Sequence, residues 1–253
     1  MHQDNNMPRR TRRGFELHTK HDEYKNRLKE AKENIQTILN SYYNPVIEFS
    51  GGKDSLVLLN LFCKEDPTLP VFYYVPSYSY NAEQIHASIK TVKNVIKSAE
   101  STGATNIHNM NLPIKENGVY NCRDYFPLLF ECMEKWDCDL EVLGIRGGES
   151  ITRKHRVKGP LIRNEGNRMV TFPIRHLTVD DVWSYIITED LFYNPQYDVM
   201  GPLYGWDKVR FTSNYNENNL AVGGQYYFEG IFFNSERNEE VNQEEWKELV
   251  SRR

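Results

Sequence analysis

The sequence has few cysteines, and none has the spacing of a common metal centre. Cys63, Cys122, Cys132 and Cys138 are scattered through 253 residues without a C-x-x-C pair. This excludes a zinc ribbon and disfavours an iron–sulfur cluster held by cysteines alone. Such cysteine usage is typical of a reducing compartment, so we expect a cytoplasmic protein.

Long apolar runs are also missing. No stretch approaches the roughly 20 apolar residues that a membrane-spanning helix needs. The start, MHQDNNMPRRTRRGF, has no apolar signal region. The composition is 39% hydrophobic and 26% charged, with a net charge of -4. We therefore expect a soluble protein with no membrane partner, and a length that suits one α/β domain with extensions.

Clustered basic charge is scarce outside the N-terminus, where Arg9, Arg10, Arg12 and Arg13 lie close together. Residues 1–20 are predicted to be a polar basic tail. A nucleic-acid-binding arm is the alternative. Because the whole chain is slightly acidic, the composition does not support a broad nucleic-acid interface.

Apolar strands and amphipathic helices alternate through residues 21–190. Apolar positions three and four residues apart predict helices at 21–40, 55–62, 81–101, 125–136 and after Thr178. Short apolar runs predict strands at 46–49, 71–75, 106–110, 140–143 and 169–174. This order predicts an α/β fold, with a five-stranded, mainly parallel sheet covered by helices on both faces.

The pattern changes after residue 190. Residues 191–233 are rich in Asn, Gly, Tyr and Pro, which predicts loops and a hairpin near 225–233. Residues 241–253 are predicted to form a polar helix. We therefore divide the chain into a tail (1–20), a nucleotide-binding domain (21–190) and a C-terminal extension that covers the site (191–253).

The segment FSGGKDS (residues 49–55) lies where the first predicted strand turns into the first helix. Gly51 and Gly52 allow close approach of a ligand to backbone N–H groups, and the helix N-terminus favours an anion. Ser50 and Ser55 add hydroxyl donors, and Lys53 adds a positive charge. These features predict a pyrophosphate cradle, although it is not a Walker A motif. The alternative is a Gly-Gly turn that only connects the strand to the helix.

Asp54 would repel a bare phosphate in that cradle. A carboxylate at this position is understandable as a ligand, direct or through water, for a Mg²⁺ ion that accompanies a nucleotide. We therefore expect Asp54 to be the metal residue of the site.

A second group of polar residues follows the fourth predicted strand. Arg146, Arg153 and Arg156 come after Gly144, at the same expected sheet edge as residues 49–55. Their guanidinium groups are suited to phosphate or sulfate oxygens. Glu149 is expected to cap the next helix or to orient Arg146. The alternative is a solvated basic loop, since Lys154, His155 and Lys158 lie beside them.

Four ordered segments then resemble one family. Residues 50–55 (SGGKDS), 143–153 (LGIRGGESITR), 172–186 (FPI…DVWSYI) and 193–201 (YNPQYDVMG) are similar to the PP-loop and later motifs of the phosphoadenosine phosphosulfate reductase family. The resemblance covers about residues 45–201. It implies the adenine nucleotide alpha-hydrolase-like fold of the PP-loop ATP pyrophosphatases.

The resemblance implies an enzyme that binds Mg-ATP and cleaves it between the α and β phosphates, with transfer of AMP to an unidentified acceptor. ATP and Mg²⁺ are the implied cofactors, and Lys53, Asp54 and Arg146 the implied catalytic residues. The implied nucleotide-binding residues are Ser50, Gly51, Gly52, Lys53, Asp54, Ser55, Gly144, Arg146, Glu149 and Arg153.

Several departures from the family pattern bear on the chemistry. The turn after the second strand, Val75-Pro76-Ser77-Tyr78, lacks the usual acidic residue, and no cysteine follows Cys138. Thiol-based sulfonucleotide reduction is therefore the least favoured of the possible functions. Cys122, beside Arg123, is the best remaining candidate for sulfur chemistry.

The alternative to an independent enzyme is a nucleotide-binding subunit of a nucleic-acid modification complex, similar to phosphorothioation enzymes, or of a defence complex. Nucleic acid or another protein is then the expected partner besides the nucleotide. We also expect either a homo-oligomer or a complex subunit.

Overall fold

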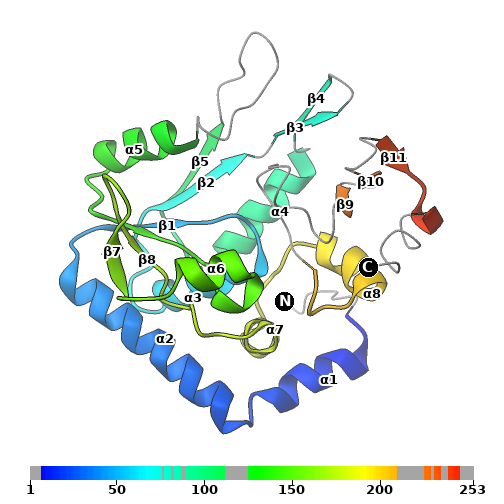
Figure 1. Ribbon diagram of the computed structural model, residues 1–253, viewed down its shortest axis with the longest axis horizontal. Helices are drawn as coiled ribbons and strands as arrows, with labels where there is room; N and C mark the ends of the chain where they lie inside the picture. Colours follow the sequence, from blue (N-terminus) through cyan, green and yellow to red (C-terminus); the bar gives the residue numbers. More distant parts are fainter. Residues whose placement is uncertain are drawn as a thin grey trace.

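The fold comes from a computed structural model, which describes residues 7–75, 77–80, 83–86, 89–111, 125–209, 225–228, 231–234 and 239–245. Within these ranges the central sheet has six strands in the order β5-β2-β1-β6-β8-β7 (Figure 1). The strands are β1 (Pro45–Glu48), β2 (Val71–Val75), β5 (Ile107–Asn111), β6 (Leu140–Val142), β7 (Ile162–Asn164) and β8 (Met169–Thr171).

The expected mainly parallel sheet is confirmed. Strands β5, β2, β1, β6 and β8 pair in parallel, and β7 pairs antiparallel with β8. The sequence predicts five strands, so β7 is an addition. It has no apolar run because it is a half-buried edge strand with the sequence Ile-Arg-Asn.

The described helices surround this sheet. They are α1 (Arg9–His18), α2 (Asp22–Ser41), α3 (Lys53–Cys63), α4 (Ile89–Glu100), α5 (Tyr125–Lys135), α6 (Ile151–Arg156), α7 (Val179–Thr188) and α8 (Gln196–Tyr204). A 3-10 turn, η2 (Gly147–Glu149), precedes α6. Of these helices, none is both long and apolar enough to cross a membrane.

Both faces of the sheet are buried, because successive strand residues point to opposite sides. On β1, Ile47 joins the main core cluster with Val57 of α3. Its neighbour Val46 packs on the other side with Leu129 of α5. Val46 and Ile47 are fully buried. This is why the strands contain near-continuous apolar runs rather than alternating ones.

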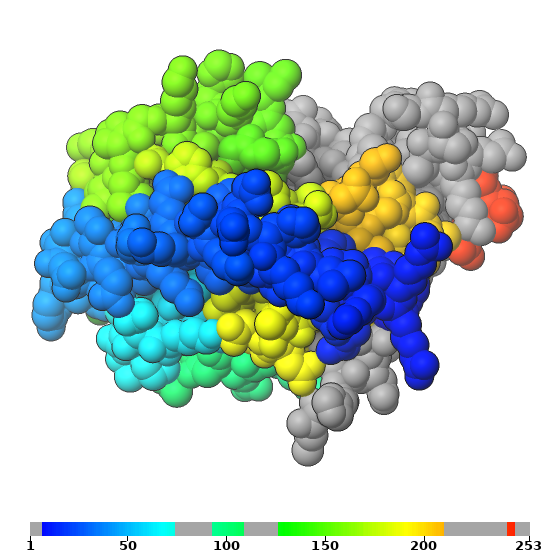
Figure 2. Space-filling view, turned by 90° about the horizontal axis from the view of Figure 1, so that it is seen from below, coloured from blue at the N-terminus to red at the C-terminus, as the bar shows by residue number. Residues whose placement is uncertain are grey.

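Within the N-terminal segment 1–20, which is predicted to be a polar basic tail, residues 9–18 form helix α1. Asp181 at the start of α7 contacts both N-terminal helices. The His18 Nε2 of α1 lies 2.8 Å from Asp181 Oδ1, and Arg27 of α2 donates to both Asp181 oxygens at 2.6 and 3.0 Å. Phe15 also stacks on Trp183. Helices α1 and α2 run across one face of the molecule (Figure 2).

The helix expected at 81–101 is wrong in its first part. Strands β3 (Ser77–Tyr80) and β4 (Glu83–His86) form an antiparallel pair, and α4 begins only at Ile89. The Ser-Tyr-Ser-Tyr alternation has the two-residue period and aromatic content that favour a strand.

The C-terminal region contains more regular structure than expected. Helix α8 lies where loops were predicted, and its Tyr197 packs edge-on against Trp183 of α7, with ring centroids 5.1 Å apart. The predicted hairpin is confirmed as β9 (Gln225–Phe228) and β10 (Ile231–Asn234), with β11 (Glu239–Val241) beside them. Most of the helix predicted at 241–253 falls outside the described residues. The three-part division of the chain stays a prediction.

Candidate functional site

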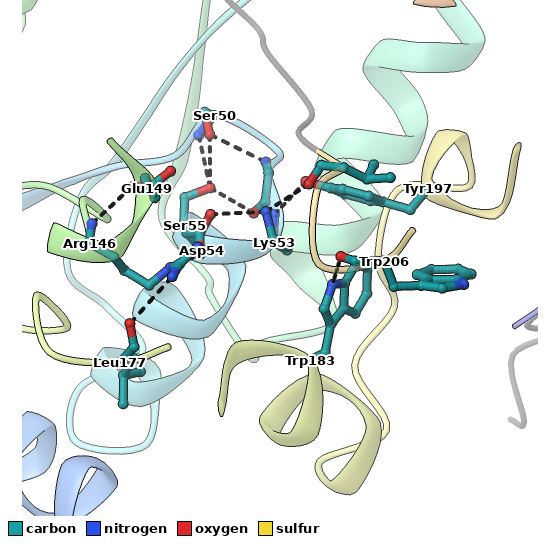
Figure 3. Close-up of polar contacts among 12 residues, drawn as sticks. Ser50, Lys53, Asp54, Ser55, Arg146, Glu149, Leu177, Trp183, Tyr197 and Trp206 are labelled. Carbon is teal, nitrogen blue, oxygen red and sulfur yellow. Dashed lines mark hydrogen bonds and ion pairs between the residues drawn. The ribbon is translucent and has the colours of Figure 1, made fainter. Parts of the chain in front are cut away.

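The loop between β1 and α3 is held in shape by its own serines (Figure 3). Ser50 Oγ accepts a hydrogen bond from the Gly52 N–H at 3.3 Å and lies 3.1 Å from Ser55 Oγ. Ser55 Oγ donates to the Gly52 carbonyl at 3.0 Å. Gly51 has a φ of 76°, a left-handed conformation that favours glycine. The loop is therefore closed on itself at the N-terminus of α3.

Lys53 is buried beneath α8 and the residues that follow it, with 2% of its surface exposed. Its backbone N–H donates to the Tyr197 hydroxyl at 2.9 Å, and its ammonium donates to the Val209 carbonyl at 2.9 Å. The ammonium also lies 3.3 Å from Asp54 Oδ2. Burial lowers the pKa of Lys53, while the charge of Asp54 opposes that shift. A phosphate must therefore compete with Val209 for this cation.

Asp54 lies between two cations. Arg146 Nε donates to Asp54 Oδ1, and Lys53 faces Oδ2. Burial works against ionisation of Asp54, but Arg146 and Lys53 outweigh it and hold the pKa of Asp54 well below its ordinary value. Asp54 is therefore an ionised counter-charge for Lys53 and Arg146.

This arrangement does not fit Asp54 as a direct Mg²⁺ ligand. Both carboxylate oxygens are engaged by cations, and a metal would have to displace one of them. Among the described residues, no three His, Cys, Asp or Glu side chains gather as a metal-binding group. The geometry of Asp54 thus favours ion pairing over metal coordination.

Arg146 reaches the cradle from the segment after β6, and its side chain is 4% exposed. Its Nη1 donates to the Leu177 carbonyl at 3.3 Å, and its backbone N–H donates to Glu149 Oε2 at 2.9 Å. Burial opposes a charged guanidinium, but Asp54 and Glu149 raise the pKa of Arg146. Glu149 also accepts a hydrogen bond from Arg153. The tertiary structure thus brings together Asp54, Arg146, Glu149 and Arg153.

Gly144 has a packing reason of its own. A Cβ atom added there would lie 3.0 Å from Ser55 Cα and 3.1 Å from the Ser55 nitrogen. The absence of a side chain therefore lets the end of β6 touch the first turn of α3. The contact of Gly144 with a nucleotide stays a prediction.

A cavity of about 910 Å³ opens beside Lys53 and Arg146. Its lining also includes residues of α6, the residues after α6 and the turn that precedes α7. The charged and polar residues of that part of the lining are Lys154, His155, Lys158, Arg175, His176 and Thr178. The site is thus much more basic than the chain as a whole.

Sequence reasoning missed three contacts of the cradle. Tyr197 lies in a segment that resembles the family, but nothing in the sequence predicts that its hydroxyl accepts a hydrogen bond from the Lys53 N–H. Leu177 and Val209 act through backbone carbonyls, so their side chains carry no signal. Only Tyr197, a hydroxyl-bearing residue inside a matched motif, offered a clue in the sequence.

Other candidates have structural roles. Arg156 donates to Glu165 at 2.9 Å and lies over the Phe172 ring. Arg12 and Arg13 of α1 both form ion pairs with Glu16. These side chains are therefore already engaged within the chain.

The described cysteines are poor nucleophiles. Burial, aided by Asp139 and Asp137, raises the pKa of the Cys138 thiol to about 12. Burial likewise raises the thiol pKa of Cys63 and Cys132. A raised pKa leaves little reactive thiolate at neutral pH. Cys122 and its neighbour Arg123 lie outside the described residues, as does Pro76.

The comparison with protein families gives one match that spans most of the chain. Residues 44–202 match the model of the phosphoadenosine phosphosulfate reductase domain. No curated protein sequence is significantly similar to the chain.

Solved structures share the fold at low sequence identity. The FMN adenylyltransferase of Candida glabrata in complex with ATP aligns with a TM-score of 0.54 and 16% identity, over 87% of this chain and 73% of that one. Its complex with FAD and inorganic pyrophosphate gives a TM-score of 0.53 and 15% identity, over 87% and 74%. The PAPS reductase of Candida auris gives a TM-score of 0.47 and 15% identity, over 67% and 84%.

Proposed function

Because this chain belongs to the phosphoadenosine phosphosulfate reductase domain family, we propose that it is a PP-loop enzyme that adenylates an acceptor at the expense of ATP. In the proposed reaction an acceptor oxygen attacks the α-phosphorus of ATP. The bond from the α-phosphorus to the α–β bridging oxygen breaks, and pyrophosphate leaves with the electron pair. The products are the AMP ester of the acceptor and pyrophosphate.

The observation that carries this proposal is the convergence of Lys53 and Arg146 on the closed serine–glycine loop. The loop supplies backbone N–H groups at a helix N-terminus, which favour phosphate. Lys53 supplies a positive charge that would stabilise the leaving pyrophosphate. For this, the Lys53 ammonium must exchange the Val209 carbonyl for a phosphate oxygen.

Arg146 is suited to the α-phosphate or the acceptor. Two of its nitrogens, Nε and Nη1, are committed to Asp54 and Leu177, which fixes the plane of the guanidinium. Its Nη2 has no hydrogen-bond partner within the described part of the chain, and Arg146 lines the cavity. A fixed guanidinium can donate to a phosphate oxygen with little further loss of freedom.

ATP is the proposed nucleotide, and Mg²⁺ stays a prediction from the sequence. The proposed transfer does not depend on a metal bound to Asp54, since that carboxylate balances Lys53 and Arg146. Its role in the proposal is to keep both cations charged and in place.

The test incubates the full chain with ATP labelled at the α-phosphate and with separate acceptors: sulfate, phosphate monoesters, carboxylates, tRNA and DNA. We expect pyrophosphate and a labelled AMP conjugate with one of them. Lys53→Met should lower the rate by about 10²–10³-fold, as for loss of a key donor to developing charge. Lys64→Met, an exposed lysine just after the same helix, is the matched control. Release of ADP instead of AMP, or an unaffected Lys53→Met, would refute the proposal.

The alternative functions have less support. Sulfonucleotide reduction needs a reactive thiol, and the described thiols have raised pKa values. For a subunit that binds nucleic acid, two of the four N-terminal arginines, Arg12 and Arg13, share an ion pair with Glu16, and the chain as a whole is acidic. An adenylating enzyme that acts on a small acceptor is therefore our preferred function.

A further inference from the structure

One part of the cavity lining, the wall formed by α6, the residues after it and the turn before α7, carries positive charge that makes no contact with the PP-loop residues 50–55. Lys154 of α6 and Lys158, just after it, line the cavity and are exposed. Neither ammonium has an ion-pair or hydrogen-bond partner among the residues that the structure describes. Arg175 adds a third cation, and its Nη1 donates to the Gly159 carbonyl at 2.8 Å. This last bond ties the turn before α7 to the segment after α6.

Acidic residues of the lining do not neutralise this wall. Glu149 accepts from the Arg146 N–H and from Arg153, so both of its oxygens are engaged. Asp207 lines the cavity as well and forms no ion pair with a described residue. Two free ammonium groups and Arg175 therefore leave a positive excess in a concave site, which attracts anions.

The same wall also offers apolar surface. Ile151 of α6 is 78% exposed and lines the cavity, as does Val179 of α7. The cavity volume of about 910 Å³ is near the upper end of the usual range for small-molecule sites, about 300–1,000 Å³. The lining suits an organic molecule with an anionic group.

We propose that Lys154 and Lys158 form an anion subsite for the acceptor, which is a small organic molecule that carries a phosphate group. Lys53 of the PP-loop lines the same cavity, and in this proposal acceptor and nucleotide bind there at the same time. The assignment of this anion to the acceptor rests on the proposed function; the anion subsite itself does not. A small molecule is favoured over nucleic acid because these cations line a cavity and the chain is acidic overall.

The test titrates the full chain with ribose 5-phosphate by calorimetry, with and without saturating α,β-methylene ATP to occupy the PP-loop. Inorganic phosphate and a short single-stranded oligothymidylate are titrated in parallel. The variant is Lys154→Glu/Lys158→Glu. The matched control is Lys32→Glu/Lys93→Glu, which changes net charge equally at exposed lysines of α2 and α4.

We expect ribose 5-phosphate to bind in the presence of the ATP analogue, and more tightly than inorganic phosphate. The Lys154/Lys158 variant should bind it at least about tenfold more weakly, since two charge-assisted contacts are reversed. Affinity for the ATP analogue should be unchanged in that variant. The control variant should keep its affinity for both ligands.

Three results would overturn this inference: no binding of ribose 5-phosphate, an equal loss in the control variant, or lysine-dependent binding of the oligothymidylate alone. The last would make the wall a nucleic-acid site. Failure of the ATP analogue to bind, with lysine-dependent binding of ribose 5-phosphate intact, would refute the proposed function but keep the anion subsite.

Discussion

Asp54→Asn tests whether this carboxylate is the counter-charge that holds the cradle together. The substitution keeps the shape of the side chain and removes its charge. Lys53 and Arg146 would then face each other without an anion between them, although both are almost fully buried. Removing one partner of a buried ion pair is strongly destabilising because the other charge stays behind.

The expected magnitude follows from the geometry. At an effective dielectric constant of about 20, two unit charges 3.3 Å apart, the separation of Lys53 Nζ and Asp54 Oδ2, attract each other by about 5 kcal/mol. Loss of one partner of a buried pair costs about 3–5 kcal/mol. We therefore expect the free energy of unfolding to fall by that amount. For a chain of this size the melting temperature should fall by roughly 6–20 °C.

The assay is urea and thermal unfolding of the wild-type chain and the variant. Asp22→Asn is the matched control, because Asp22 makes a 3.0 Å ion pair with Lys25 while its side chain is 88% exposed. An exposed pair of this kind contributes about 0.5 kcal/mol or less. If Asp54→Asn cost no more than Asp22→Asn, the counter-charge reasoning would be refuted.

The dependence on pH gives a second check. Because the pKa of Asp54 is held below its ordinary value of 3.8, its stabilising effect is complete above that value. It is lost only as the pH falls through the lower pKa of the folded state. The difference between wild type and Asp54→Asn should therefore be constant from neutral pH down to about pH 4. A difference that vanished near pH 6 would contradict the assignment.

Two further substitutions test the packing around the site. Gly144→Ala places a Cβ 3.0 Å from the Ser55 backbone. This variant should lose about 1–3 kcal/mol of stability and should bind an ATP analogue more weakly in calorimetry. The control is Gly14→Ala, which adds a Cβ in open space on α1 and should stabilise the chain by up to about 1 kcal/mol. Asp181→Asn should cost about 3–5 kcal/mol in urea unfolding, because the fully buried Asp181 pairs with Arg27. It should also speed amide hydrogen exchange in α1, and unchanged exchange there would contradict the role of Asp181.

Much of the fold could be predicted because local patterns agree with it. The apolar runs at 71–75 and 140–143 are strands, since a parallel sheet buries both faces of its strands. Thr178 and Asp181 form a capping box at the start of α7, where the sequence predicted a helix. The errors fell where tertiary packing decides the local structure. Helix α8 contains Gly201 and Pro202 and ends before Gly205, so its sequence predicts a loop; the helix becomes evident only once its aromatic residues pack on α7.

The sequence by itself determined the cradle, because its chemistry is contained in one short segment. Two glycines, two serines and Lys53 in six consecutive residues at a strand-to-helix turn are best explained by phosphate binding. The sequence also determined the place of Arg146 and Glu149. They follow β6, which lies beside β1 and parallel to it in the sheet, so they must lie at the same sheet edge as the cradle.

Only the tertiary structure decided what those residues touch. The Tyr197 hydroxyl and the Val209 carbonyl lie more than 140 residues from Lys53 in the chain, and both bond to it. The prediction of a Mg²⁺ ion held by Asp54, directly or through water, rests on the charge of this residue in a phosphate cradle, and charge alone does not reveal a protein partner. Folding supplied Arg146 and Lys53 on either side of that carboxylate. It also gathered Lys154 and Lys158, which look like a solvated loop in the sequence, onto the wall of one cavity.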